Sequence, residues 1–219
     1  MRKLMTLFVL ACLTGGLQAQ NYWDGSRPDH RLTVGVRGGV NFSKQYNTGD
    51  GADMDFRTSY QVGIEADLNI FRSLSVNTGA MLIQKGYKTA YADYRGSMET
   101  KDNATYIEIP LLLSYRVKLS DAAQFQLNVG PYFAFGVSGK QRIESTFPGL
   151  KSYEIDSYDE YDGMKKQDIG IHAGVAVTYN NFYAGACYER GLKNVSNVPN
   201  ADFRNGTIAI TVGYNFNLF

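Results

Sequence analysis

Apolar and polar residues alternate with a period of two along most of the chain beyond residue 30, which is the pattern of a β-strand with two different faces. Residues 208–218, for example, place Ile, Val, Tyr, Phe and Leu on one face and Ala, Thr, Gly and Asn on the other. The segments exceed the roughly 5–6 residues of a usual strand and suit a tilted crossing of a bilayer. Eight segments follow the pattern, the seventh least clearly: 32–42, 60–70, 74–82, 107–117, 125–137, 168–179, 182–192 and 208–218.

The connections between these segments alternate between long and short. The short ones include residues 71–73 and the pair 180–181, whose two asparagines tolerate the left-handed backbone that a tight hairpin needs. A barrel that crosses a membrane as a meander has short turns on the periplasmic side and long loops outside. The sequence therefore predicts an all-β fold, an eight-stranded antiparallel up-and-down transmembrane β-barrel with both termini on the periplasmic side.

The direction of the apolar face separates a membrane barrel from a secreted soluble β-calyx that binds an apolar ligand. A calyx turns its apolar face inward, whereas a membrane barrel turns it toward lipid. Aromatic residues at the expected strand ends, such as Tyr60, Tyr179 and Phe182, are typical of membrane girdles and favour the barrel. Eight strands leave room inside for side chains only, so the polar face should form a packed interior network rather than line an open pore. We expect this interior polar network to contain Arg37, Glu65, Asp67, Glu108, Arg116, Asp168 and His172.

The N-terminal segment has the features of a secretory signal peptide. Two basic residues precede an apolar stretch at 4–13, and small residues precede Ala19. Cleavage after Ala19 divides the chain into a signal peptide, 1–19, and an outer-membrane β-barrel domain, 20–219. Processing as a lipoprotein at Cys12 is the alternative, although it would leave a very short apolar core.

Composition narrows the function classes further. The 22 Lys and Arg residues nearly balance the 21 Asp and Glu residues, so a nucleic-acid partner held by bulk charge is not expected. With only two cysteines, one of them in the expected signal peptide, a disulfide scaffold and a CxxC zinc site are excluded. Beyond the first 20 residues, no apolar run approaches the roughly 20 residues of a membrane helix.

Two sequence motifs are similar to those of a known family. Residues 106–115 read YIEIPLLLSY and are followed by GPY at 130–132, while residues 35–41 read G-x-x-G-G-x-N. This combination resembles the PorT-like outer-membrane β-barrel family, which is abundant in Bacteroidota, and the resemblance covers essentially the whole chain after the signal peptide. It implies an eight-stranded outer-membrane barrel and, for PorT itself, a link to type IX protein secretion. The C-terminal Phe219 resembles the terminal aromatic used in barrel assembly, although it is out of phase with the apolar face.

One pair of residues invites a catalytic interpretation. Some membrane barrels that modify lipid A use a Ser/His pair near the outer rim, and Ser138 and His172 are both expected to point inward on neighbouring strands. If the hairpin pairs symmetrically across its loop, about five residues of strand separate them, or roughly 16 Å. That separation is beyond hydrogen-bond reach. We therefore expect no catalytic residue, no cofactor and no metal site.

The longest connection is rich in tyrosine and carboxylate groups. It lacks the ligand order of a calcium-binding hand. A solvated extracellular loop is the simplest interpretation, and a surface that contacts lipopolysaccharide, sugar or protein is the alternative. The residues available for such a loop interaction are Tyr153, Asp156, Tyr158, Asp159, Tyr161 and Asp162.

The sequence thus predicts an exported, non-enzymatic structural or accessory protein of the outer membrane, associated with type IX secretion if the family resemblance extends that far. Its expected partners are outer-membrane lipid and lipopolysaccharide, the barrel-assembly machinery and secretion-system proteins. A lipid A-modifying barrel enzyme and the soluble β-calyx remain as alternatives.

Overall fold

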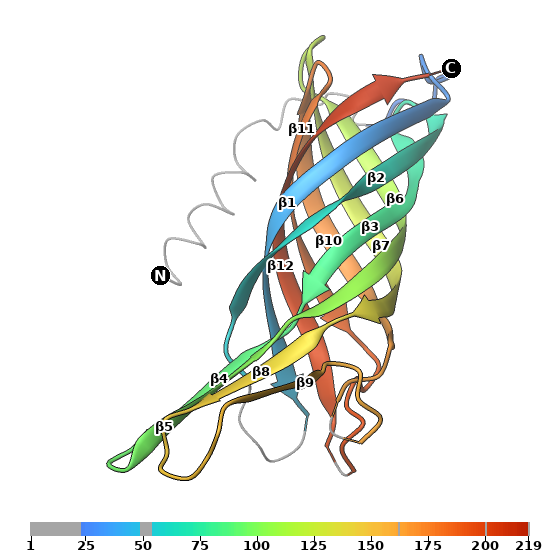
Figure 1. Ribbon diagram of the computed structural model, residues 1–219. Helices are drawn as coiled ribbons and strands as arrows, with labels where there is room; N and C mark the ends of the chain where they lie inside the picture. The colour runs from blue at the N-terminus through green and yellow to red at the C-terminus, as the bar shows by residue number, and fades with distance from the viewer. Residues whose placement is uncertain (1–22, 49–53, 162, 200, 219) are drawn as a thin grey trace.

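The computed structural model describes residues 23–48, 54–161, 163–199 and 201–218. It shows a closed β-barrel with a smaller sheet that extends from one of its ends (Figure 1). The predicted signal peptide, 1–19, and the terminal Phe219 lie outside the described residues. Within the described ranges, no helix has the length and apolar character needed to span a bilayer.

Eight antiparallel strands of 10–16 residues form the barrel. Neighbours around the barrel are neighbours among these strands along the chain, and pairing of the first with the last closes the ring. This confirms the predicted fold class. The barrel strands are β1 (Leu32–Asn47), β2 (Arg57–Phe71), β3 (Leu74–Lys85), β6 (Ala104–Lys118), β7 (Ala123–Ser138), β10 (Gln167–Tyr179), β11 (Phe182–Gly191) and β12 (Phe203–Asn217).

The two ends of the barrel differ in their connections. Short turns lie at the end where the described chain begins and finishes, and there the Leu218 backbone N–H donates to the Leu32 carbonyl at 2.9 Å. In one of these turns Asn180 has a φ of 53°, the left-handed conformation expected for this residue. In a barrel of this kind the turn end is periplasmic and the opposite end is extracellular.

The extracellular end carries a four-stranded sheet, which we name the outer sheet. Its strands, in spatial order, are β4 (Lys88–Asp93), β5 (Gly96–Asp102), β8 (Lys140–Ser145) and β9 (Tyr153–Asp156). Figure 1 shows it projecting sideways from the barrel. The prediction of irregular loops here was wrong, because β4 and β5 continue the hairpin of β3 and β6 beyond the rim after breaks of only two and one residues.

Apolar side chains of the barrel point outward. On β6, Leu111 is 49 % exposed whereas its neighbour Leu112 is 3 % exposed, and the polar Asn128 on β7 is 7 % exposed. The soluble calyx is therefore overturned, since its apolar face would have to line the interior.

Pro110 lies within β6, and because a proline has no N–H to donate to the ladder, the sequence predicts a bulge or a bend at this position. The pairing of β6 with β7 keeps the same register on both sides of Pro110, and the shift falls between Thr105 and Tyr106 instead. Pro110 therefore produces no bulge: the ladder between β6 and β7 is interrupted without an extra residue, since Leu111 and Leu112 have no partner on β7, although both pair with β3.

Candidate functional site

The interior of the barrel holds three groups of buried charges. In the first, Arg37 Nε lies 2.9 Å from Glu65 Oε2, and Arg37 Nη2 donates to Asn215 Oδ1 at 2.8 Å. The guanidinium also lies over the Tyr183 ring, 4.0 Å from its centroid. This group ties β1, β2, β11 and β12 together.

The second group lies nearer the periplasmic end. Arg116 Nη2 is 3.0 Å from Asp67 Oδ2, and Asn77 donates to the other oxygen of Asp67 at 3.1 Å. Arg116 also donates to Asn69 Oδ1. The fixed fork of the guanidinium thus connects β6 to β2, and the carboxylate has a partner on each oxygen.

The third group is centred on the ammonium of Lys85, which is completely surrounded by protein. Its Nζ lies 2.6 Å from Glu108 Oε2, 3.1 Å from Glu189 Oε2 and 3.6 Å from Asp168 Oδ2. The same ammonium sits 3.9 Å from the centroid of the Tyr132 ring. One cation thus faces three carboxylates and an aromatic ring.

Two members of this group were not predicted. The pattern placed the end of the third segment at 82, whereas β3 continues to Lys85. Glu189 lies on the strand with the least clear pattern, β11. The sequence did contain a signal for Lys85. If the alternation is continued beyond Leu82, Gln84 falls on the outward face with Leu82, and Lys85 falls on the inward face.

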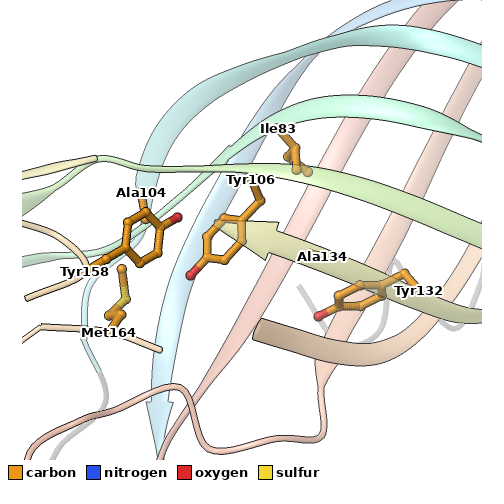
Figure 2. Close-up of a cluster of buried hydrophobic side chains, with 7 residues drawn as sticks. All are labelled: Ile83, Ala104, Tyr106, Tyr132, Ala134, Tyr158 and Met164. Carbon is orange, nitrogen blue, oxygen red and sulfur yellow. The ribbon is translucent and has the colours of Figure 1, made fainter. Parts of the chain in front are cut away.

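The extracellular half of the interior is closed by larger, less polar side chains. Tyr106 and Tyr132 are completely buried, and Tyr158 packs edge-on against Tyr106 with ring centroids 5.6 Å apart. Figure 2 shows the cluster: Ile83, Ala104, Tyr106, Tyr132, Ala134, Tyr158 and Met164. The extracellular half of the interior is therefore packed as expected, although it is not purely polar, whereas a cavity of about 550 Å³ lies at the periplasmic end beside Thr33, Arg116 and Asn215.

His172 and Ser138 are not brought together. His172 pairs with Gly130 across β10 and β7, which leaves eight residues of β7, or about 26 Å, between the two positions. The symmetric pairing assumed from the sequence was wrong, because residues 139–166 do not form a simple hairpin loop. Ser138 is also exposed rather than directed inward. His172 Nδ1 lies 3.1 Å from Glu189 Oε1 and belongs to the Lys85 group.

The outer sheet has two different faces, and residues directly opposite one another in antiparallel strands share a face. Tyr91 lies opposite Met98 and Ile143 lies opposite Tyr153, and the pairing of Met98 with Ser145, two residues after Ile143, places all of them on one face. Tyr91 is 60 % exposed and its ring stacks on Phe147 with centroids 6.3 Å apart. We name this the aromatic face.

The other face of the outer sheet, which we name the charged face, carries a row of ion pairs. Lys88 and Lys101 approach Glu99 at 3.1 and 2.5 Å, and Arg142 approaches Glu154 at 2.6 Å. With Glu144, which lies opposite Glu99 on the same face, these residues comprise three cations and three anions, so this face carries no strong potential of one sign.

The six residues predicted for loop interaction occupy different environments. Tyr153 and Tyr161 are 57 % and 78 % exposed. Tyr158, in contrast, is buried and donates its hydroxyl to the Thr105 carbonyl at 2.8 Å. Asp156 and Asp159 each accept a hydrogen bond from the backbone two residues later, which holds a turn; Asp162 lies outside the described residues.

Asp102 lies where the outer sheet joins the barrel. Ser157 donates to its Oδ1 at 2.6 Å, and its Oδ2 has no hydrogen-bond partner. Burial raises the pKa of this carboxyl group to about 7, because the charged form loses its hydration. The group thus titrates near neutral pH at the base of the sheet.

This chain is similar to several solved structures, among them the outer membrane protein OprG. Ail, the attachment invasion locus protein of Yersinia pestis, is 13% identical, with 84% of this chain and 98% of that chain covered and a TM-score of 0.42. OprG from Pseudomonas aeruginosa is 11% identical, with 90% and 100% covered and a TM-score of 0.47. Neisserial surface protein A is 12% identical, with 84% and 97% covered and a TM-score of 0.40.

Among curated proteins, none has a significantly similar sequence. A family model, described as outer membrane protein beta-barrel domain, matches residues 18–197. The match includes seven of the eight barrel strands and the whole outer sheet. With its closed barrel, outward apolar face and internal charges, this chain belongs to the outer membrane protein beta-barrel domain family.

Proposed function

We propose that this outer-membrane barrel is a non-enzymatic, PorT-like accessory protein that binds a protein partner through its outer sheet. The observation that carries the proposal is the exposed aromatic face, centred on Tyr91 and Tyr153. Large exposed aromatic side chains grouped on one surface are typical of interaction sites. A rigid sheet also presents them with little loss of side-chain entropy on binding.

The edges of the outer sheet support the same proposal. The sheet has the order β4-β5-β8-β9, so β4 and β9 each lack a neighbouring strand along one side over most of their length. Such edges can pair with an extended segment of another protein. A partner strand added there would extend the aromatic face.

The interior supports a scaffold rather than a channel or an enzyme. The Lys85 group and the buried tyrosines close the extracellular half of the barrel, and Ser138 and His172 are too far apart for the lipid A chemistry considered above. The proposal includes export by the signal peptide and contact with lipopolysaccharide around the rim. An association with type IX secretion rests on the resemblance of residues 106–115 and 130–132 to the PorT-like family.

Affinity capture of the intact protein from outer membranes tests this proposal. We expect secretion-system proteins to be captured with the wild type and lost when Tyr91→Ser and Tyr153→Ser are combined. The matched control combines Lys101→Ser and Arg142→Ser on the charged face, and it should retain the partner. Shortening the whole of 151–163 would be a poorer test, since it also removes Ser157 and Tyr158, which pack at the barrel rim.

Capture that is unchanged by the aromatic substitutions would contradict the proposal. Lipid A that changes in composition when His172→Ala is introduced would instead revive the enzyme alternative. In both cases the heat-dependent gel mobility of the variant verifies that the barrel has assembled.

A further inference from the structure

Three different metal-ligating side chains meet on the inner face of β10 and β11. His172 lies directly opposite Glu189 in the register, and Cys187 precedes Glu189 by two residues on the same face. One candidate ligand atom from each residue lies within 4.8 Å of the other two. All three side chains are directed away from lipid, into the protein interior.

The space beside these groups is kept open by a glycine. A Cβ atom placed at Gly174 would lie 2.9 Å from Cys187 Cβ and 3.2 Å from His172 Nε2. A cavity of about 30 Å³ is lined by all four of these residues. This volume suits one ion or one water molecule.

The surrounding charges favour a cation at this position. Lys85 alone faces Glu108, Glu189 and Asp168, so this group carries two negative charges in excess when every carboxyl group is ionised. The other two interior groups are balanced pairs, Arg37 with Glu65 and Arg116 with Asp67. A divalent cation bound with one thiolate would remove one unit of the excess. Protonation of carboxyl groups is the other way to remove it, and it needs no metal.

The donor set indicates the class of metal. Imidazole, thiolate and carboxylate together suit Zn²⁺ and similar first-row transition metals rather than Ca²⁺ or Mg²⁺, which prefer oxygen ligands. The separation of 3.1 Å between His172 Nδ1 and Glu189 Oε1 is close to the roughly 3.3 Å between two ligands of a tetrahedral metal with bonds of about 2.0–2.1 Å. The cavity leaves room for water as the fourth ligand.

We propose that His172, Cys187 and Glu189 bind one zinc-like divalent metal ion inside the barrel and thereby link β10 to β11. Cys187 loses its thiol proton to solvent as the metal binds. Lys85 holds the second oxygen of Glu189 at 3.1 Å, which leaves Oε1 directed toward His172 and the metal. This inference is independent of the partner proposed for the outer sheet.

Titration of the full-length protein in detergent with Co²⁺ and then Zn²⁺ tests the proposal. We expect one metal ion per chain, an ultraviolet thiolate-to-cobalt absorption band, and displacement of Co²⁺ by Zn²⁺. Cys187→Ser should abolish the band, and His172→Gln should weaken binding more than about tenfold, since removal of even an indirect partner of a metal ligand costs about 10–100-fold. Gly174→Ala keeps every donor but fills the space, and it should also weaken binding.

In the predicted barrel domain, 20–219, Cys187 is the only cysteine and His30 is the one other histidine, so His30→Gln is the matched control and should bind metal as the wild type does. Wild-type absorption that persists in Cys187→Ser, or equal affinity in His172→Gln, would overturn the proposal. If these variants fail to assemble, the rate at which Cys187 is alkylated in the wild type, with and without Zn²⁺, tests the proposal instead. Zn²⁺ should slow this reaction at least about tenfold, and an unchanged rate would overturn the proposal.

Discussion

The carboxyl group of Asp102 provides a pH-dependent contact at the base of the outer sheet. Its pKa is raised to about 7 by burial, against about 3.9 for an unfolded chain. Between these values the folded state holds a proton that the unfolded state has released, so the free energy of local unfolding falls as pH rises through about 4 to 7.

We therefore expect the amides of residues 139–164 to be better protected from hydrogen exchange at pH 5 than at pH 8, after correction for intrinsic rates. Asp102→Asn keeps the group neutral and should remove this difference. Asp121→Asn, in an exposed periplasmic turn, is the control and should keep it. If protection in the wild type instead rises with pH, the expected fall in the free energy of local unfolding with rising pH is wrong.

Lys85 is the buried charge with the largest expected effect on stability. Lys85→Met leaves Glu108, Glu189 and Asp168 without their shared cation. Breaking a buried ion pair costs about 3–5 kcal/mol, because the remaining charge is left without compensation. We expect a loss of that size in denaturant unfolding in lipid vesicles. Lys118→Met, which affects an exposed pair with Asp121, should change stability by less than about 1 kcal/mol; equal effects would contradict the arrangement.

The alternation of residues indicates which side most residues face, with Ser138 as an exception, but not which residues meet. The alternation placed Arg37 and Glu65 on polar faces, and the structure pairs them. It did not identify Lys85, and it did not foresee that His172 and Cys187 come together. Pairing depends on the register between strands, which residue periodicity alone does not determine.

Among the elements, β6 separates the lipid and interior environments most clearly. Leu111 points outward and Asn128, on the adjacent β7, points inward. Leu111→Arg should cost about 2–4 kcal/mol, as expected for a cation facing lipid near the membrane centre. Asn128→Ser should cost much less, since it keeps a polar side chain in a polar interior. Denaturant unfolding in vesicles measures the loss of stability in each variant, and equal losses would contradict this assignment of the two faces.

The outer sheet was the element hardest to foresee. Strands β4 and β5 are short and rich in polar and charged residues, most of them exposed or half-buried, so their composition resembles that of a solvated loop. They form a sheet because β3 and β6 bring their ends together and β8 supplies a further neighbour. Tyr158 is buried for a related reason, since Met164 donates its backbone N–H to the Ser157 carbonyl and the Tyr158 hydroxyl reaches the Thr105 carbonyl at the barrel rim.

For the molecule as a whole, the alternation of long and short connections was enough to predict eight strands in an up-and-down order. The same pattern predicted short turns and both chain ends at one side of the barrel, as found for the described residues. This alternation of connections could not predict how the interior is packed, because the packing depends on which long side chains reach across the barrel. Tyr106, Tyr132 and Lys85 close the interior together.

Location in the cell follows from this architecture. We expect the protein to fractionate with the outer membrane, and to shift in gel mobility when heated, because a closed barrel unfolds slowly in detergent. Recovery in the soluble periplasm without detergent would contradict an outer-membrane barrel.

The contact between the outward apolar face and lipid is tested most directly by tryptophan quenching with brominated lipids. Adjacent residues of β7 face opposite ways, since Phe133 is 37 % exposed and Tyr132 is fully buried. The only tryptophan, Trp23, is first removed by the substitution Trp23→Phe. Phe133→Trp and Tyr132→Trp are then introduced separately, so that the quenching of two tryptophans at nearly the same depth can be compared. We expect strong quenching at position 133 and weak quenching at position 132. Equal quenching at the two positions, or stronger quenching at 132, would contradict a barrel that turns its apolar face to the membrane.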